Sequence, residues 1–158
     1  MAKEAAGHTA KDIMTSPVLT IGKDKSVAEA VKVLLEKQIG ALPVVDTDGK
    51  YLGIVTERTL LPHEEGVPFL RGTVLVFLGQ FVSGDQDIEK ALEEARDRKV
   101  SDVMAKHVPT VTEDTPVSDL AAKMIHQHVH HIPVLRAGKV VGIVSRHDLL
   151  RVMAGLPG

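Results

Sequence analysis

The fold is decided by two pairs of stretches: Leu42-Pro43-Val44-Val45 and Gly53-Ile54-Val55-Thr56 return as Ile132-Pro133-Val134-Leu135 and Gly142-Ile143-Val144-Ser145. A repeat of this kind predicts one supersecondary unit, written twice, that cannot bury its apolar face alone and packs against its own copy. The groove between two such copies is a natural place for a ligand.

Helix signals extend the repeat outward from these stretches. Apolar residues at positions 27, 30, 31 and 34, and again at 117, 120, 121 and 124, have the spacing of one buried helix stripe per copy. The first helix is predicted to begin with a capping box at Ser26-Val27-Ala28-Glu29. The second is predicted to begin at Thr115, followed by Pro116 in the first turn.

Turn and cap signals complete each copy. Asp48-Gly49 stands between two β-rich runs and predicts a hairpin, because glycine accepts the positive φ of such turns. Thr56 and Ser145 are each suited to be the N-cap of a final helix. The sequence therefore predicts an α/β (α+β) fold of two pseudo-symmetric repeats, each a small three-stranded sheet packed with two helices. We place repeat 1 at residues 9–61 and repeat 2 at residues 98–153.

Residues 62–98 belong to neither repeat and form a predicted insert. Its glycines and prolines indicate irregular chain at first, and a helix is predicted from about Asp87 to Lys99. All three phenylalanines, Phe69, Phe77 and Phe81, fall in this insert. They either pin a long connector onto its own module or form an apolar patch that docks a second subunit or a partner.

Composition limits the function classes. The 158 residues carry 19 basic and 21 acidic side chains, a net charge of −2, which does not favour nucleic acid or an acidic membrane surface as a partner. No cysteine is present, so disulfides and thiolate chemistry are excluded. The longest apolar stretch, Val74–Leu78, is far shorter than a bilayer requires. We expect a cytoplasmic protein.

The stretch from Ser145 to Asp148 carries the strongest chemical signal. A hydroxyl residue ends a strand, and a carboxylate three positions later falls in the first turn of a helix. Together they could bind a vicinal diol, although the same spacing is also that of a simple capping pair. Known motifs for phosphate loops, dinucleotide sites, zinc proteases and hydrolase nucleophiles are absent from the sequence.

The ordered, duplicated pattern of Asp-φ-Met, Leu/Ile-Pro-Val-φ and Gly-Ile-Val-[Thr/Ser]-x-x-[Asp] resembles the CBS domain, named after cystathionine β-synthase. Two copies resemble a tandem CBS pair, or Bateman module. The resemblance implies clefts between the two halves that bind adenosyl ligands such as AMP, ADP, ATP or S-adenosylmethionine, with Mg²⁺ an optional companion of the nucleotide. It also implies that the carboxylate of the last motif holds the ribose hydroxyls.

Transferred residue by residue, the resemblance implies one adenosyl site that combines a ribose-binding helix start with a base pocket. Its residues would be Ser145, Arg146, His147, Asp148, Met14, Pro17, Val18, Leu19, Ile39, Gly40, Ala41, Pro43 and His130. The symmetry-related second site lacks the carboxylate, because Thr59 replaces it. That site would be built from Thr56, Arg58, Thr59, Lys106 and His131.

A cluster of histidines leaves open a different class of site, one that binds a metal or a phosphate. His126, His128, His130 and His131 straddle a predicted helix end and a strand start, so they need not converge on a metal. They are either surface and cleft-edge histidines or a metal or pH-dependent phosphate site. We assign no metal ligand to either adenosyl site.

These observations favour a non-catalytic sensor over an enzyme. We expect a regulatory module that binds an adenosyl ligand, forms a homodimer and signals to an unknown protein partner in trans. The alternatives are a structural or interaction module with vestigial clefts and, with less support from the motifs, a histidine-metal phosphohydrolase.

Overall fold

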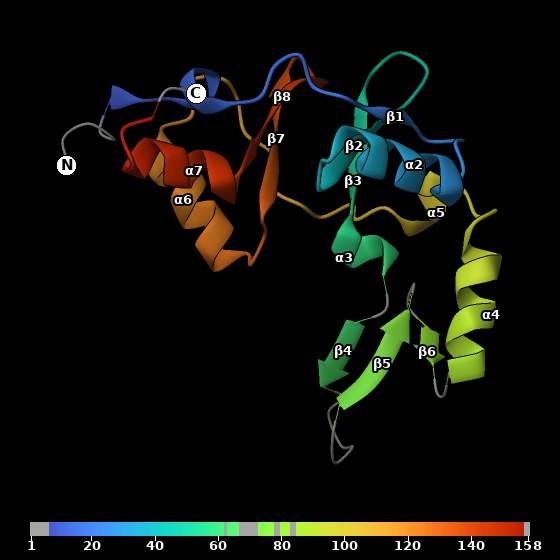
Figure 1. The fold of residues 1–158 in the computed structure, drawn as a ribbon. Coiled ribbons are helices and arrows are strands. Elements are labelled where there is room, and N and C mark those ends of the chain that lie inside the picture. Colours follow the sequence, from blue (N-terminus) through green and yellow to red (C-terminus); the bar gives the residue numbers. More distant parts are fainter. Residues whose placement is uncertain (1–6, 62, 67–72, 78–79, 83–84, 157–158) are drawn as a thin grey trace. The chain divides into compact units, whose positions relative to one another are not determined.

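The computed structural model describes residues 7–61, 63–66, 73–77, 80–82 and 85–156, with side chains described outside 62–88. The chain divides into two compact units (Figure 1). The first consists of Met1–Thr20, Val45–Tyr51 and His107–Gly158, and the second of Ile21–Val44 and Leu52–Lys106. Each unit therefore combines segments that are far apart in sequence.

Repeat 1 supplies a sheet and two helices. The sheet has the order β1 (Ile21–Gly22), β2 (Ala41–Val45) and β3 (Tyr51–Thr56). The helices are α2 (Val27–Lys37) and α3 (Glu57–Leu60). The predicted capping box is confirmed, because Glu29 N donates to Ser26 Oγ and Ser26 N donates to the Glu29 carboxylate at 2.9 Å.

Repeat 2 has the corresponding elements: α6 (Val117–His126), β7 (His131–Arg136), β8 (Lys139–Ser145) and α7 (Arg146–Met153). β7 and β8 pair antiparallel. The third strand is reduced to a parallel bridge between Val111 and Val134, where Val111 N donates to Pro133 O at 3.1 Å. The sheet-and-helix repeat is thus present in both copies, but the sheet of repeat 2 has two strands where three were predicted.

The predicted start of α6 is one residue early. Pro116, rather than Thr115, is the N-cap residue, and the helix begins at Val117. The Thr115 hydroxyl is used in the preceding turn, where it accepts a hydrogen bond from Thr112 N at 3.2 Å. It is therefore not a helix cap.

Both hairpins turn through residues with positive φ. Gly49 has φ 80° and Gly138 has φ 77°, as the Asp-Gly signal predicts for the first hairpin. In the second hairpin Ala137 also has φ 50°. The predicted final helices are confirmed as well, with Thr56 and Ser145 as their N-caps.

The insert is more regular than its glycines and prolines suggest. It contains a three-stranded antiparallel sheet of β4 (His63–Gly66), β5 (Thr73–Phe77) and β6 (Gln80–Val82), then α4 (Asp85–Ala95). The strands are so short that most of the glycines and prolines of the insert fall outside them in the sequence. Phe69 and the side chains of Phe77 and Phe81 lie outside the described residues, so both interpretations of these phenylalanines stay predictions.

A reciprocal exchange of leading segments was not predicted. The one-turn helix α1 (Ala10–Ile13) precedes repeat 1 in sequence but packs in the first unit on α7 and β8. The one-turn helix α5 (Val100–Val103) precedes repeat 2 but lies in the second unit, where Val100 N donates to Lys25 O at 2.8 Å. Each repeat is therefore completed by the segment that leads into the other.

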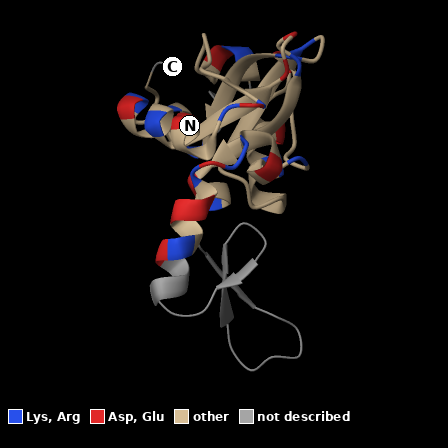
Figure 2. Ribbon diagram, turned by 90° about the vertical axis from the view of Figure 1, so that its right-hand side faces the viewer, with Lys and Arg blue, Asp and Glu red and all other residues tan. Residues whose placement is uncertain are grey.

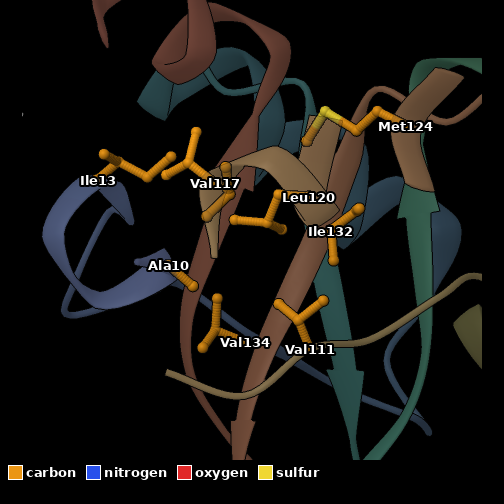
Figure 3. Packing of buried hydrophobic residues seen from close by; sticks show 9 residues of the cluster. Ala10, Ile13, Val111, Val117, Leu120, Met124, Ile132 and Val134 are labelled. Atoms are coloured by element: carbon orange, nitrogen blue, oxygen red, sulfur yellow. The ribbon is translucent and has the colours of Figure 1, made fainter. Parts of the chain in front are cut away.

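Each unit has its own apolar core. In the first unit, Ala10 and Ile13 of the exchanged segment pack with residues of α6, β7 and β8 (Figure 3). The buried members are Ala10, Ile13, Val111, Val117, Leu120, Met124, Ile132, Val134 and Val144. In the second unit, Val100 joins a cluster that contains Leu34, Leu42 and Val55. Burying one such aliphatic side chain contributes about 1.5–3 kcal/mol, so the exchange is held by both cores.

Two glycines permit the exchange. A Cβ at Gly53 would lie 2.7 Å from Ala105 O and 2.9 Å from Met104 Sδ, and a Cβ at Gly142 would collide with the Met14 side chain. The methionine of each Asp-φ-Met motif therefore lies against the glycine of the other repeat's Gly-Ile-Val motif.

No helix in the described part of the chain is long and apolar enough to cross a membrane.

Candidate functional site

The start of α7 fixes the two residues that form the proposed ribose site. Ser145 N donates to Asp148 Oδ2 at 2.7 Å, Ser145 Oγ donates to the same oxygen at 2.8 Å, and Asp148 N donates back to Ser145 Oγ at 3.3 Å. Ser145 and Asp148 thus form a capping box, the structural role that the spacing left open. Asp148 is half-buried, and its Oδ1 accepts no hydrogen bond from the described residues.

The segment that leads into repeat 1 runs beside the strand that ends at Ser145. Thr15 and Ile143 exchange two backbone hydrogen bonds, of 2.9 and 3.2 Å, and Ser16 Oγ donates to Val141 O at 2.9 Å. The structure therefore brings Met14 and the residues that follow it into the unit that contains Asp148. Of the residues predicted for the base pocket in this segment, Met14 and Val18 are half-buried, whereas Pro17 and Leu19 are exposed.

Two basic side chains meet next to the cap. Arg146 Nη1 lies 3.2 Å from His130 Nε2, and Arg146 N donates to His130 O at 3.0 Å. Both side chains are exposed, as is His147. The sequence predicts all three as site residues, but it does not predict that Arg146 and His130 touch.

The other four residues predicted for the adenosyl site belong to the second unit, around the start of β2. Ile39 and Gly40 are half-buried, and Ile39 N donates to Leu34 O at the end of α2. Ala41 and Pro43 are buried.

The predicted second site has a neutral version of the same cap. Thr56 N donates to Thr59 Oγ1 at 2.8 Å, and Thr59 Oγ1 donates to Thr56 O at 2.9 Å. Arg58 and Lys106 are exposed in this second unit, whereas His131 belongs to β7 of the first. The hydroxyl of Thr59 occupies the place of a carboxylate without supplying its charge.

The histidine cluster offers no metal centre. Among the residues that the structure describes, no group of three or more His, Cys, Asp or Glu side chains is arranged to hold a metal ion. His126 ends α6, and the chain then turns through His128, which has φ 52°.

Arg136 of repeat 2 forms an ion pair with Glu113. Arg136 donates to both carboxylate oxygens of Glu113, from Nε at 2.7 Å and from Nη2 at 2.6 Å. The hydrogen bonds from Arg136 lower the pKa of Glu113, and the same contact raises the pKa of Arg136. Basic and acidic side chains are otherwise interspersed along the ribbon (Figure 2).

A buried phenol was missed by the sequence reasoning. Tyr51 Oη is buried and has no hydrogen-bond partner among the described residues. Burial raises the pKa of Tyr51 to about 12. The sequence does contain one sign of it: Tyr51, the single tyrosine of the chain, begins β3 at the position where repeat 2 has Val140.

Comparison with known proteins gives two matches to one family model. The model for the CBS domain matches residues 10–65 and 100–155. Over 144 residues the chain is 33% identical to a CBS domain-containing protein of Dictyostelium discoideum, covering 90% of this chain and 89% of that one. It is 31% identical to L-aspartate semialdehyde sulfurtransferase of Methanocaldococcus jannaschii, but spans only 23% of that longer protein.

Solved structures give the same picture. The CBS domain pair of protein MJ0100, in complex with 5′-methylthioadenosine and S-adenosyl-L-methionine, superposes with a TM-score of 0.68 at 30% identity, covering 93% of this chain and 96% of that one. CBSX2 in complex with AMP superposes with a TM-score of 0.70 at 25% identity, covering 94% and 98%.

Proposed function

Because this chain belongs to the CBS domain family and carries the domain twice, we propose that it is a non-catalytic regulatory module that binds an adenosyl ligand. Similar CBS proteins have been solved with S-adenosyl-L-methionine, 5′-methylthioadenosine and AMP. These three ligands share an adenosine moiety, so the ligand class proposed for this chain is defined by adenosine.

The observation that carries the proposal is the open oxygen of Asp148. Its Oδ2 is engaged by the amide and hydroxyl of Ser145, while Oδ1 accepts no bond from the described residues. A carboxylate oxygen can accept from the two adjacent hydroxyls of a ribose, and such charge-assisted bonds are about twice as strong as neutral ones. Because the cap already fixes the side chain, little conformational entropy is lost on binding.

We propose that the segment after α1 contacts the adenine base of the ligand. This segment belongs to the same unit as Asp148 and carries four apolar side chains, those of Met14, Pro17, Val18 and Leu19. The Leu19 side chain is 45% exposed, which is unusual for a large apolar residue. An adenine ring would cover part of this apolar surface and gain about 25 cal/mol per Å² removed from water.

The regulatory step is proposed to act in trans. A ligand changes the output of such a module only by binding one conformation more tightly than another. We therefore propose that adenosyl binding shifts the populations of arrangements that a partner protein distinguishes, and that the chain works as a homodimer. The activity of longer relatives, such as the sulfurtransferase, is not transferred to this chain.

A thermal-unfolding panel tests the proposal. AMP, ADP, ATP, S-adenosylmethionine and 5′-methylthioadenosine are compared with guanosine monophosphate as a control that shares ribose and phosphate but not the base. A true ligand at 100 times its Kd adds about 2.7 kcal/mol of stability, which raises Tm measurably. If none of the adenosyl compounds raises Tm, the chain is a structural or interaction module instead.

A further inference from the structure

Ser16 makes the last hydrogen bond of the segment that leads out of α1. Its Oγ donates to Val141 O at 2.9 Å, next to the two backbone hydrogen bonds that join Thr15 and Ile143. From residue 17 to residue 20 the chain forms neither helix nor strand, and these residues make no hydrogen bond within the described part of the chain. The Ser16 hydroxyl is therefore the last tether before three residues of the proposed base pocket, Pro17, Val18 and Leu19.

Close packing holds the part of the segment that precedes Ser16. Ile13 is buried in the core of the first unit, and Met14 lies so close to Gly142 that a Cβ there would collide with it. Ser16 thus stands at the boundary between a packed part of the segment and a part without hydrogen bonds. At such a boundary, one side-chain bond extends the ordered part of the chain by a few residues.

The segment that leads into repeat 2 has the same backbone bonds but lacks this tether. Ala105 and Ile54 exchange two backbone hydrogen bonds, of 2.9 and 3.0 Å. Lys106 stands at the position of Ser16, is exposed, and has no side-chain hydrogen bond or ion pair among the described residues. The tether therefore occurs in the unit that contains Asp148 and is missing from the other unit.

We propose that Ser16 is a positioning residue for the adenosyl site, whose hydroxyl holds the segment from Pro17 to Leu19 beside β8 for contact with adenine. The inference rests on the proposed function, since it assumes that this segment contacts the base. Binding costs less conformational entropy when the contacting side chains are ordered beforehand. Because Ser16 is exposed and water can replace its bond, the stability of the fold should depend on it only slightly.

Titration calorimetry of Ser16 variants with AMP and 5′-methylthioadenosine tests the inference. Ser16→Ala and Ser16→Val should bind each compound about 2- to 10-fold more weakly than wild type, because one intramolecular hydrogen bond contributes a factor of this size. Ser16→Thr keeps the hydroxyl and has the shape of Ser16→Val, so it should bind like wild type. The loss should be equal for both compounds, since they share adenosine and only AMP carries a phosphate.

Ser118→Ala is the matched control, since Ser118 is an exposed serine on α6 of the same unit and should not affect binding. The Tm of each ligand-free variant should stay within about 2 °C of wild type, as expected for a weak exposed bond.

Three results would overturn this inference alone. Ser16→Val that binds as tightly as Ser16→Thr would show that the hydroxyl is not needed. A loss confined to AMP would place the effect at the phosphate, and a much larger fall in the Tm of ligand-free Ser16→Ala would show that Ser16 supports the fold. Wild-type protein that binds none of the adenosyl compounds overturns the proposed function itself.

Discussion

Tyr51 gives a residue-scale prediction that needs no ligand. Burial raises its pKa to about 12, from an ordinary value of 10.0. Below pH 10 the phenol is neutral in both the folded and the unfolded chain and makes no difference to stability. Between pH 10 and 12 the unfolded chain releases this proton while the folded chain keeps it, so the free energy of unfolding should fall as the pH rises.

The measurement is simple because the chain has one tyrosine and no tryptophan. Tyrosinate absorbance should titrate with a midpoint near 12 in the folded protein and near 10 in concentrated urea. Tyr51→Phe, the control, should remove the signal and stabilise the fold by about 1 kcal/mol, since it deletes a buried hydroxyl that has no hydrogen-bond partner in the described part of the chain. A folded-state midpoint near 10 would mean that the phenol is hydrated.

At the scale of elements, α3 and α7 differ at the residue on which the proposed ribose site depends, which is Thr59 in α3 and Asp148 in α7. The Thr56–Thr59 cap repeats the Ser145–Asp148 cap closely, with backbone N to side-chain oxygen distances of 2.8 and 2.7 Å. Thr59→Asp should therefore fit the existing geometry. It should also add a carboxylate at a helix N-terminus, which contributes about 0.3–1 kcal/mol to stability.

In binding terms, Thr59→Asp should create a second ribose acceptor. Calorimetry should show either a higher stoichiometry than wild type or tighter binding by about 1.5–3 kcal/mol at a second site. Thr59→Asn keeps the size without the charge and should show a smaller gain. If both variants bind like wild type, then groups other than residue 59 decide whether this repeat takes a ligand.

The elements themselves were largely predictable, because their signals are local. Ser26 and Glu29 form the capping box that their spacing predicts, and Gly49 takes the positive φ that its turn requires. The strands β4 to β6 are not predictable in this way, because the glycines and prolines near such short strands indicate irregular chain. The contact between Arg146 and His130 also had no local signal, because it joins residues 16 positions apart.

On the scale of the whole molecule, the exchange of leading segments could not be predicted. Asp12-Ile13-Met14 and Asp102-Val103-Met104 are nearly identical, so the sequence does not say which copy packs against which repeat. Burial decides it: Ile13 joins the core of the first unit, and Val100 that of the second. As a consequence, the proposed site depends on residues from both ends of the chain, Met14 to Leu19 and Ser145 to Asp148.

Assembly is the prediction at this scale. The first unit exposes large apolar side chains on α6, on α7 and just beyond α7: Ile125 at 68%, Leu150 at 59%, Met153 at 78% and Leu156 at 57%. Pairing would bury such surface at about 25 cal/mol per Å², and stable interfaces cover about 1,600 Å². We expect sedimentation to give twice the 17.0 kDa chain mass at low micromolar concentration.

Replacing Leu150 and Met153 together by glutamate should shift that sedimentation toward monomer, because buried charges at an interface are costly. Replacing the exposed Leu92 of α4 by glutamate is the matched control and should leave the mass unchanged. Wild-type protein that sediments only as a monomer, with and without nucleotide, would contradict the homodimer.

The affinity of Asp148→Ala for AMP, measured by titration calorimetry beside that of Asp12→Ala, tests the proposed ribose site most directly. Asp12 makes the same kind of cap with Thr9, at 2.8 and 3.0 Å, so its variant loses a comparable cap without touching the proposed ribose acceptor. We predict that Asp148→Ala weakens binding by about 1.5–3 kcal/mol, roughly 10- to 150-fold, while Asp12→Ala binds like wild type. An unchanged dissociation constant in folded Asp148→Ala would contradict the account and leave Asp148 as a helix cap alone.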